Sequence, residues 1–440
     1  DGFCFRGHKN KASLLAGRLG CTEKLAMLKK IPTSELALGM YIHKFCGAWV
    51  AHPFWKGSFE LKDALDIVRI QQSAITEVWV DTGKGHPPVT DDNPQQFEAP
   101  FLPPSPPIPF VQPATIPSRV SLDEELSQAL KICVRAKEAV VKMFSDARLG
   151  QAIKVEDGAF LVDEITNSIL RRPHALISLA RLKTSDDYTY MHSVAVCILM
   201  IALARQLQMN EEQVREAGMA GLMHDVGKMM ISSAILDKAG KLTPEEFKLV
   251  QSHPEEGLKI LERSEDVSTH VLDVCLHHHE KINGLGYPHG LAGDQISLFA
   301  RMGAVCDVYD AVTSERSYKK GWGPAHSIRE MASWKGHFDE IVFQSFVKTI
   351  GIYPIGALVS LQSGRMGVVI EQNEQSLLTP KVKVFLSTRS KMAIPHKIID
   401  LACLEEPDKI VQIELAEDWG ITNAEELWSG LSLAEGNLFG

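Results

Sequence analysis

Apolar positions recur at helical spacing through the middle of the chain. In residues 194–207 and 214–223 they fall three or four positions apart, so each segment presents one apolar face. A further helix is predicted to begin at Thr243, whose hydroxyl can cap it, while a proline suits the first turn and Glu246 can bond back to the cap. The pattern predicts an α-helical domain over residues 119–350.

Short runs rich in β-branched and aromatic side chains lie on both sides of this helical region. They are residues 41–43 and 78–80 before it, and residues 357–361, 367–370 and 382–386 after it. The first runs predict a small mixed α/β domain at residues 27–84, and the later ones predict a small β-rich segment at residues 351–440. The fold class predicted for the whole chain is therefore mainly α, with a smaller domain or segment on each flank.

Residues 85–117 contain eleven prolines. Proline has no backbone N–H to donate, so this stretch can form neither a helix interior nor a central strand. We predict an extended linker at residues 85–118. The chain begins at Asp1 and Met27 is a candidate natural start, so residues 1–26 are interpreted as an extension or a non-native sequence.

Composition places the chain among ordinary globular proteins, since 45% of its 440 residues are hydrophobic and 23% are charged. No apolar run approaches the length of about 18 residues that spans a bilayer, so no membrane segment is expected. The net charge of -9 and the pI near 6.0 argue against a general DNA binder. The eight cysteines are scattered without a Cys-x-x-Cys pair, which favours reduced thiols and a cytoplasmic location.

Histidines are concentrated in one part of the chain. Eight of the sixteen fall within residues 192–289. Three of them form the run at residues 277–279, which leads into a loop marked by Gly286 and Pro288. Imidazole is the commonest metal ligand in proteins, so this stretch predicts a metal site near a helix end. A solvated helix end is the alternative for such a run considered alone.

The pair His224-Asp225 ends an apolar helical segment and has Lys228 one turn later. It offers one imidazole nitrogen and up to two carboxylate oxygens, and a carboxylate can bridge two cations. This mixed donor set suits iron, manganese or zinc better than calcium or magnesium. Taken alone, the pair is more often a helix-end hydrogen bond than a site.

The order and spacing of these motifs resemble the HD-GYP domain, a branch of the HD metal-dependent phosphohydrolases. The resemblance covers residues 120–350. Its matching segments are His192-Ser193, residues 224–228, residues 242–247, His253-Pro254, His278-His279-Glu280, residues 284–291 and residues 307–313. The segment before the proline-rich linker resembles the small uncharacterised domain that often precedes HD-GYP domains.

The resemblance implies a helical HD-type hydrolase that opens the ring of a cyclic dinucleotide, cyclic di-GMP or 3'3'-cyclic GMP-AMP, to give the linear dinucleotide. A hydroxide activated by two divalent metal ions would attack phosphorus. Carried over position by position, the implied metal ligands are His192, His224, Asp225, His253, His278, His279 and Asp307. Asp225 would bridge the ions, and His277 would be the extra, structural histidine. Iron or manganese is expected, with zinc as the third candidate.

The resemblance also assigns residues to the substrate. Arg316 and Lys319 match basic residues that the family places on the substrate phosphates, and Tyr287 is expected to contact the ligand. Asp225 and Lys228 are the expected catalytic residues, and Lys228 would offset phosphate charge. Basic residues in a polar loop are usually only solvated, and that is the alternative for Arg316 and Lys319.

Two positions depart from the family's pattern. Asn283 stands where Asp is usual, which removes a charge beside the loop but no metal ligand. Tyr188 stands where some members carry a Glu that binds a third metal, and a phenol is a poor ligand for such ions. We therefore predict two metal ions per chain.

Two alternative functions stay open. One is a non-catalytic cyclic-dinucleotide sensor or protein-interaction module, although such family members typically lose ligands and this chain keeps all seven. The other is a different HD-type phosphohydrolase acting on nucleotides, against which the Gly-Tyr-Pro loop counts. The expected setting is bacterial signalling. Expected partners are the cyclic dinucleotide, cyclase-type signalling proteins bound through the Gly-Tyr-Pro loop, and a second copy in a homodimer.

Overall fold

The computed structural model describes residues 28–45, 59–62, 67, 70–71, 76–85, 122–183, 188–238, 240–314, 321–373, 376–403 and 407–431. The chain divides into two compact units, Asp1–Val111 and Gln112–Gly440. The predicted extension at residues 1–26 and nearly all of the predicted linker at residues 85–118 lie outside the described residues. Each unit is described by itself below.

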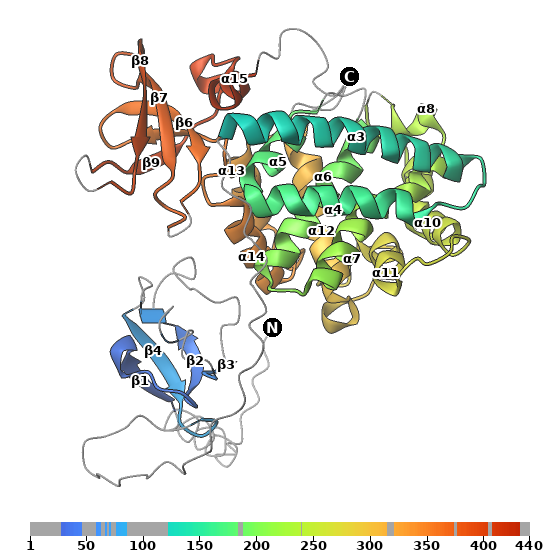
Figure 1. Cartoon of the computed structure of the whole chain (residues 1–440), viewed down its shortest axis with the longest axis horizontal. Coiled ribbons are helices and arrows are strands. Elements are labelled where there is room, and N and C mark those ends of the chain that lie inside the picture. Colours follow the sequence, from blue (N-terminus) through green and yellow to red (C-terminus); the bar gives the residue numbers. More distant parts are fainter. Residues whose placement is uncertain are drawn as a thin grey trace, which may run out of the picture. The chain divides into compact units, whose positions relative to one another are not determined.

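The N-terminal unit contains an antiparallel four-stranded sheet in the order β1-β4-β2-β3 (Figure 1). Its strands are β1 (Leu28–Pro32), β2 (Tyr41–Phe45), β3 (Phe59–Glu60) and β4 (Glu77–Asp81). Along β4 the side chains of Val78 and Val80 are buried and their neighbours are half-buried, the alternation expected of a strand with one face on a core. Ile31 and Ile42 from the two adjacent strands belong to the same core. The strands predicted at residues 41–43 and 78–80 are thus confirmed.

The second unit is mainly helical, as predicted. Its helices are α3 (Leu122–Arg148), α4 (Val155–Arg171), α5 (Pro173–Ala180), α6 (Tyr188–Gln206), α7 (Glu211–Met223), α8 (Ser233–Leu236), α9 (Pro244–Val250), α10 (His253–Leu261), α11 (Thr269–His277), α12 (Leu298–Thr313), α13 (Pro324–Ser333) and α14 (Glu340–Ile350). A short 3-10 helix, η3 (Val226–Met230), follows α7.

Helix α6 is the centre of this unit, with α3, α4, α5, α7, α12 and α14 all in contact with it (Figure 1). Its residues 191–204 are buried without exception. The stretch Thr189–Gln206 is long and apolar enough to cross a membrane by length and composition, with a mean hydropathy of 1.3, but 78% of it is buried inside the protein. The apolar character of α6 therefore belongs to a core helix on which the others pack.

Local sequence signals place the ends of the helices around α6. The Thr243 hydroxyl accepts a hydrogen bond from the Glu246 N–H at 3.2 Å, and the Glu246 carboxylate accepts one from the Thr243 N–H at 2.7 Å. This is the predicted capping box at the start of α9. Helix α7 lies close to α6, because a Cβ added at Gly221 would come within 2.8 Å of the Cys197 Cα. That approach positions the residues that follow α7.

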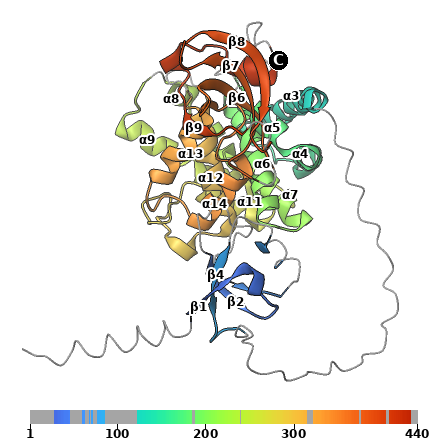
Figure 2. The ribbon, with the colours of Figure 1, turned by 90° about the vertical axis from the view of Figure 1, so that its left-hand side faces the viewer.

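A five-stranded antiparallel sheet in the order β8-β7-β6-β5-β9 follows the helices (Figure 2). Its strands are β5 (Leu358–Leu361), β6 (Arg365–Glu371), β7 (Lys381–Ser387), β8 (Ala393–Asp400) and β9 (Ile410–Ile413). The three predicted strands of this region are confirmed as β5, β6 and β7. The strands at the two edges, β8 and β9, carried no such signal, since most of β8 is exposed and it contains Pro395, a residue that edge strands tolerate.

This sheet packs against the helices through two apolar clusters, one of which joins Ala325 of α13 to Val359 and Val382 of the sheet. The other cluster involves α3, α5 and the last helix. Leu126 of α3 and Ala175 of α5 meet Leu358 and Met366 of the sheet and Trp428 of the last helix, α15 (Ala424–Ser429). Arg181, just after α5, adds polar links by donating to the Ile355 carbonyl at 3.1 Å. The end of α5 is thereby tied to the β-rich segment.

A glycine makes the closest backbone contact between η3 and α10, so we expect Gly227→Ala to destabilise the fold. A Cβ at Gly227 would lie 1.9 Å from the His253 carbonyl oxygen and 2.4 Å from the Gly257 nitrogen, which forces the two elements apart. The free energy of unfolding, measured by urea denaturation, should fall by about 3 kcal/mol.

Gly323→Ala is the matched control, because a Cβ at Gly323 meets nothing within 4 Å. Gly323 precedes α13, and its replacement by Ala should lower the free energy of unfolding by less than about 1 kcal/mol. Equal losses in the two variants would contradict the proposed contact.

Candidate metal centre

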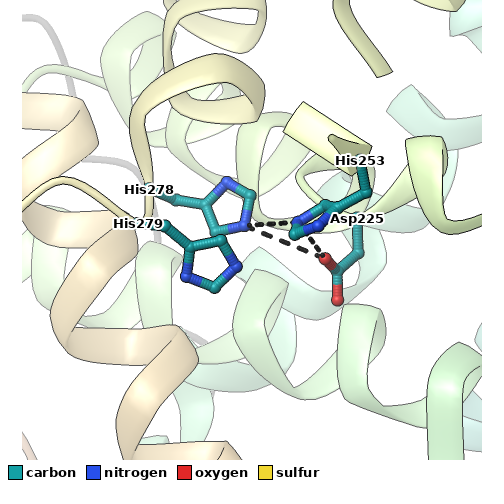
Figure 3. Close-up of side chains that lie close together, drawn as sticks. All are labelled: Asp225, His253, His278 and His279. Carbon is teal, nitrogen blue, oxygen red and sulfur yellow. Dashed lines mark hydrogen bonds and ion pairs between the residues drawn. The ribbon is translucent and has the colours of Figure 1, made fainter. Parts of the chain in front are cut away.

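Residues inside α6 and α12 and at the ends of other helices bring the seven predicted metal ligands together in two groups. One group holds His192, His224 and Asp307, and the other holds Asp225, His253, His278 and His279. Within each group the candidate ligand atoms all lie within 4.8 Å of one another. Figure 3 shows the second group, with His253 and His278 turned toward the Asp225 carboxylate. Residues separated by more than 100 positions in the sequence are thus neighbours.

Three of the histidines are held in one tautomer by backbone carbonyls three or four residues earlier. These bonds join the Nδ1 of His224 to Gly221 at 2.8 Å, that of His253 to Val250 at 2.7 Å, and that of His278 to Val274 at 2.9 Å. A carbonyl oxygen can only accept, so each Nδ1 carries the proton and donates it. Each Nε2 is left with a lone pair, the form in which imidazole binds a metal ion.

The lone pairs of His253 and His278 face one another, and that of His224 faces the ring of His192. The Nε2 atoms of His192 and His224 are 3.3 Å apart, as are those of His253 and His278. The two lone pairs of His253 and His278 repel at that distance unless a proton or a cation lies between them. The Asp225 Oδ1 atom is also buried and makes no hydrogen bond within the part of the chain that the structure describes. The residues present therefore fit divalent metal ions, and their nitrogen and oxygen donors fit transition metals better than calcium or magnesium.

Asp225 faces both groups. Its Oδ2 lies 3.3 Å from the His224 Nε2 and 3.4 Å from the His192 Nε2, whereas its Oδ1 lies 3.2 Å from the His253 Nε2. Lys228 also contacts Oδ2, at 2.5 Å. One carboxylate thus offers an oxygen to each group, which is the geometry that a bridging ligand needs.

Electrostatics keep three of these side chains in metal-binding protonation states. Burial alone would raise the pKa of Asp225, but Lys228 and the neighbouring histidines hold it well below its usual range. His192 and His279 have the same effect on the pKa of the buried Asp307. Burial lowers the pKa of His278 to about 3, so this imidazole is neutral at pH 7. Ionised carboxylates and neutral imidazoles are the forms that bind metal ions.

His192 differs from the other histidines. Burial alone would lower its pKa, but hydrogen bonds to Asp225, Asp307 and Asp310 raise it to about 10. The His192 Nδ1 lies 2.6 Å from a carboxylate oxygen of Asp310 rather than from a backbone carbonyl. The other Asp310 oxygen accepts a 2.5 Å hydrogen bond from the buried Lys183.

Asp310 and Lys183 were given no role by the sequence motifs. Asp310 could have been found, because it lies three residues after Asp307 and therefore on the same face of α12. Lys183 carried no signal, since only the fold brings it beside Asp310.

Known proteins match both units of the chain. The family described as "HD domain" matches residues 167–342, and the one described as "Domain of unknown function (DUF3391)" matches residues 28–157. Over 415 residues the chain is 55% identical to the protein named cyclic di-GMP phosphodiesterase PA4108 of Pseudomonas aeruginosa, covering 94% of this chain and 98% of that one. The chain belongs to the HD-GYP family.

More distant relatives match shorter parts. The chain is 44% identical over 121 residues to the cyclic di-GMP phosphodiesterase response regulator RpfG of Xanthomonas campestris, covering 27% of this chain and 32% of the relative. It is 39% identical over 134 residues to 3'3'-cGAMP-specific phosphodiesterase 3 of Vibrio cholerae, covering 30% and 29%. A solved HDG"Y"P protein of Bdellovibrio bacteriovorus is 17% identical with a TM-score of 0.42, covering 72% of this chain and 98% of that one.

The Gly-Tyr-Pro loop of this HD-GYP domain lies directly against His279. A Cβ at Gly286 would come within 2.4 Å of the Glu280 Cα, so only glycine allows the loop to approach this closely. The Tyr287 ring then stacks on the His279 ring, with centroids 4.6 Å apart. Tyr287 was predicted to contact the ligand, and in the structure it supports one of the candidate metal ligands.

Buried Glu280 fixes the far end of the loop, a role that the sequence motifs did not assign. Its two oxygens accept hydrogen bonds from the backbone N–H groups of His289 at 2.8 Å and Leu291 at 3.0 Å. Asn283 accepts a hydrogen bond from the Leu285 N–H at 3.0 Å and belongs to neither group, so it acts as a turn residue. The presence of Asn283 in place of the family's usual Asp therefore affects a turn of the loop and not the two groups of candidate ligands.

The remaining predicted residues lie away from the two groups or outside the described residues. His277 bonds to Asp273 at 2.7 Å and to His289 at 3.1 Å and belongs to neither group. Arg316 and Lys319 lie outside the described residues, as does the side chain of Tyr188. Their predicted roles stay predictions.

Asp225→Ala should remove both metal ions from this HD-GYP domain, because one carboxylate serves both groups. His253→Ala should lower the affinity for one ion by at least about 100-fold and leave the affinity for the other unchanged. The measurement is the metal content per chain by mass spectrometry after equilibration at fixed free Mn²⁺.

His277→Ala is the control, since it alters the same histidine run outside both groups and should keep both ions. Retention of one tightly bound ion by Asp225→Ala would rule out the bridging geometry.

Proposed function

We propose that this protein is a metal-dependent phosphodiesterase that hydrolyses cyclic di-GMP to the linear dinucleotide. The observation that carries the proposal is the pair of buried His/Asp groups that share Asp225. Two metal sites joined by one carboxylate are a common arrangement for attack of water on a phosphate ester. The similarity to the Pseudomonas aeruginosa protein over nearly its whole length supports the choice of substrate.

The charge of the centre suits an anionic phosphodiester. When bound, two divalent cations would supply Lewis acidity and lower the pKa of water. Asp225 and Asp307 are the carboxylates of the two groups, and the other five side chains are imidazoles. The loaded centre therefore keeps a net positive charge, to which the Lys228 ammonium adds. This local charge accounts for phosphate binding by a protein whose net charge is -9.

Lys228 is placed to act on both the centre and the substrate. Its ammonium lies 2.5 Å from the Asp225 Oδ2, and its side chain is 20% exposed, so it lies at the boundary between the buried groups and solvent. From there it can orient Asp225 and donate to a phosphate oxygen. Arg316 and Lys319 complete the proposal as further phosphate contacts, with Tyr287 beside the ligand.

The metal ions are proposed to be iron or manganese, with zinc as the third candidate. The two groups combine five imidazoles with two carboxylates and contain no thiolate, which is the donor set these ions share. Two ions per chain follow from the division of the seven residues into two groups. Three stoichiometric ions would contradict this count.

Cyclic di-GMP is preferred to 3'3'-cyclic GMP-AMP as substrate because of how much of each relative is matched. The relative named for cyclic di-GMP is matched over 98% of its length, and the Vibrio cholerae 3'3'-cGAMP-specific phosphodiesterase 3 over 29%. The shorter match is nevertheless 39% identical over its 134 residues. Both nucleotides therefore belong in the assay.

A cytoplasmic location and protein partners belong to the same proposal. The cysteines within the described ranges are free thiols, which suits a reducing compartment. Leu285, at the tip of the Gly-Tyr-Pro loop, is 75% exposed and offers an apolar contact to a cyclase-type signalling protein. Homodimer formation is tested by light scattering of the purified protein.

The protein loaded with Mn²⁺ or Fe²⁺ should convert cyclic di-GMP to the linear dinucleotide, identified by liquid chromatography and mass spectrometry. Lys228→Met should keep both metal ions and lower kcat/KM by about 100-fold, because a charge that stabilises the transition state is lost. His277→Ala should retain full turnover.

Tight binding of cyclic di-GMP to the metal-loaded protein without any product would instead identify a sensor module. Turnover of 3'3'-cyclic GMP-AMP alone would correct the substrate.

A further inference from the structure

Lys183 is a buried lysine for which the proposed reaction has no use. Its side chain is 0% exposed, and it belongs to neither His/Asp group. A buried ammonium is costly unless it is paired and hydrogen-bonded. The Lys183 Nζ lies 2.5 Å from the Asp310 Oδ1 and 3.5 Å from the Ala180 carbonyl oxygen. Such a residue requires an explanation in terms of what it holds in place.

Asp310 connects Lys183 to the candidate metal ligand His192. Its second oxygen, Oδ2, lies 2.6 Å from the His192 Nδ1, and the carboxylate is 4% exposed. His224, His253 and His278 bond instead to rigid carbonyls. A carboxylate can rotate about its own bonds, so the orientation of His192 depends on what fixes Asp310.

We propose that Lys183 is a positioning residue of the metal centre: through Asp310 it holds His192 in the tautomer and orientation that turn Nε2 toward the other members of its group. The His192 Nε2 lies 3.0 Å from Asp307 and 3.3 Å from the His224 Nε2. Lys183 occupies the Asp310 oxygen that His192 does not use, which prevents the carboxylate from turning away. It also offsets the charge of a third buried carboxylate beside Asp225 and Asp307.

The β-rich segment holds Lys183 in place. Two residues earlier, Arg181 donates to the Ile355 carbonyl at 3.1 Å and to the Glu425 carboxylate of α15 at 3.2 Å. Leu182 packs against one of the apolar clusters between the helices and the sheet. The segment that ends in Lys183 is therefore fixed on one side by the β-rich C-terminal segment and on the other by Asp310. The β-rich segment thus becomes part of the support of the metal centre.

Lys183→Met tests the proposal in the full-length, metal-free protein titrated with Mn²⁺. We expect the affinity of one of the two sites to fall by 10- to 100-fold, the usual effect of losing a residue that supports a metal ligand. The affinity of the other site should change less than about threefold. Lys259→Met is the control, because Lys259 is an exposed lysine paired with Glu256, and both affinities should stay as in the wild type.

A double-variant cycle separates action through Asp310 from other effects. Asp310→Asn should weaken the same site, and Lys183→Met combined with Asp310→Asn should weaken it no further than Asp310→Asn alone. Additive losses would overturn the route through Asp310.

A purely structural role gives a different result. In that case Lys183→Met lowers the Tm of the metal-free protein while both Mn²⁺ affinities stay within twofold of the wild type, which overturns the proposal. If the methionine variant does not fold, Lys183→Gln takes the same titration with the same expected loss at one site, because it removes the charge that holds Asp310.

The inference rests on the metal centre of the proposed function and not on the substrate. Failure of the wild type to bind Mn²⁺ would overturn the proposed function, whereas wild-type affinities in the Lys183 variants overturn only the role of Lys183.

Discussion

The position of the Asp225 carboxylate between two sets of imidazoles is the constraint on which the rest of the site depends. Each oxygen faces a different group, so a displacement of this one residue would affect both. Asp225 follows the end of α7, and α7 can lie against α6 only because Gly221 has no side chain to meet Cys197. A packing contact in the core thus decides where a charged group stands in the site.

Backbone carbonyls near helix ends orient three of the histidines. The last carbonyls of a helix have no partner within that helix, and a nearby imidazole can take one of them. Gly221 near the end of α7 and Val250 at the end of α9 each accept from a histidine three residues later, and Val274 near the end of α11 accepts from both the backbone N–H and the ring of His278. A single hydrogen bond therefore satisfies a helix end and fixes a tautomer. It also turns the other ring nitrogen toward the centre.

His192 lies within α6, where the backbone carbonyls are used by the helix itself. Its orientation depends on a carboxylate from α12 and a lysine from the segment after α5. Three separate elements must then be in place for one candidate ligand, and the β-rich C-terminal segment holds one of them through Arg181. This dependence explains why a segment outside the helical domain has a physical connection to the metal centre.

The sequence by itself determined the features that depend on local spacing. Helical periodicity and the capping box at Thr243 predicted the helices, and the resemblance of the motifs identified the seven residues that the fold gathers. Edge strands such as β8 were not predicted, because exposure to solvent removes the alternation of buried and exposed side chains that marks a strand. Only the tertiary structure decided how the seven residues divide into two groups, that Asp225 faces both, and that Asp310 and Lys183 stand behind His192. Those facts are distances between elements far apart in the chain, and such distances are set by packing rather than by neighbouring residues.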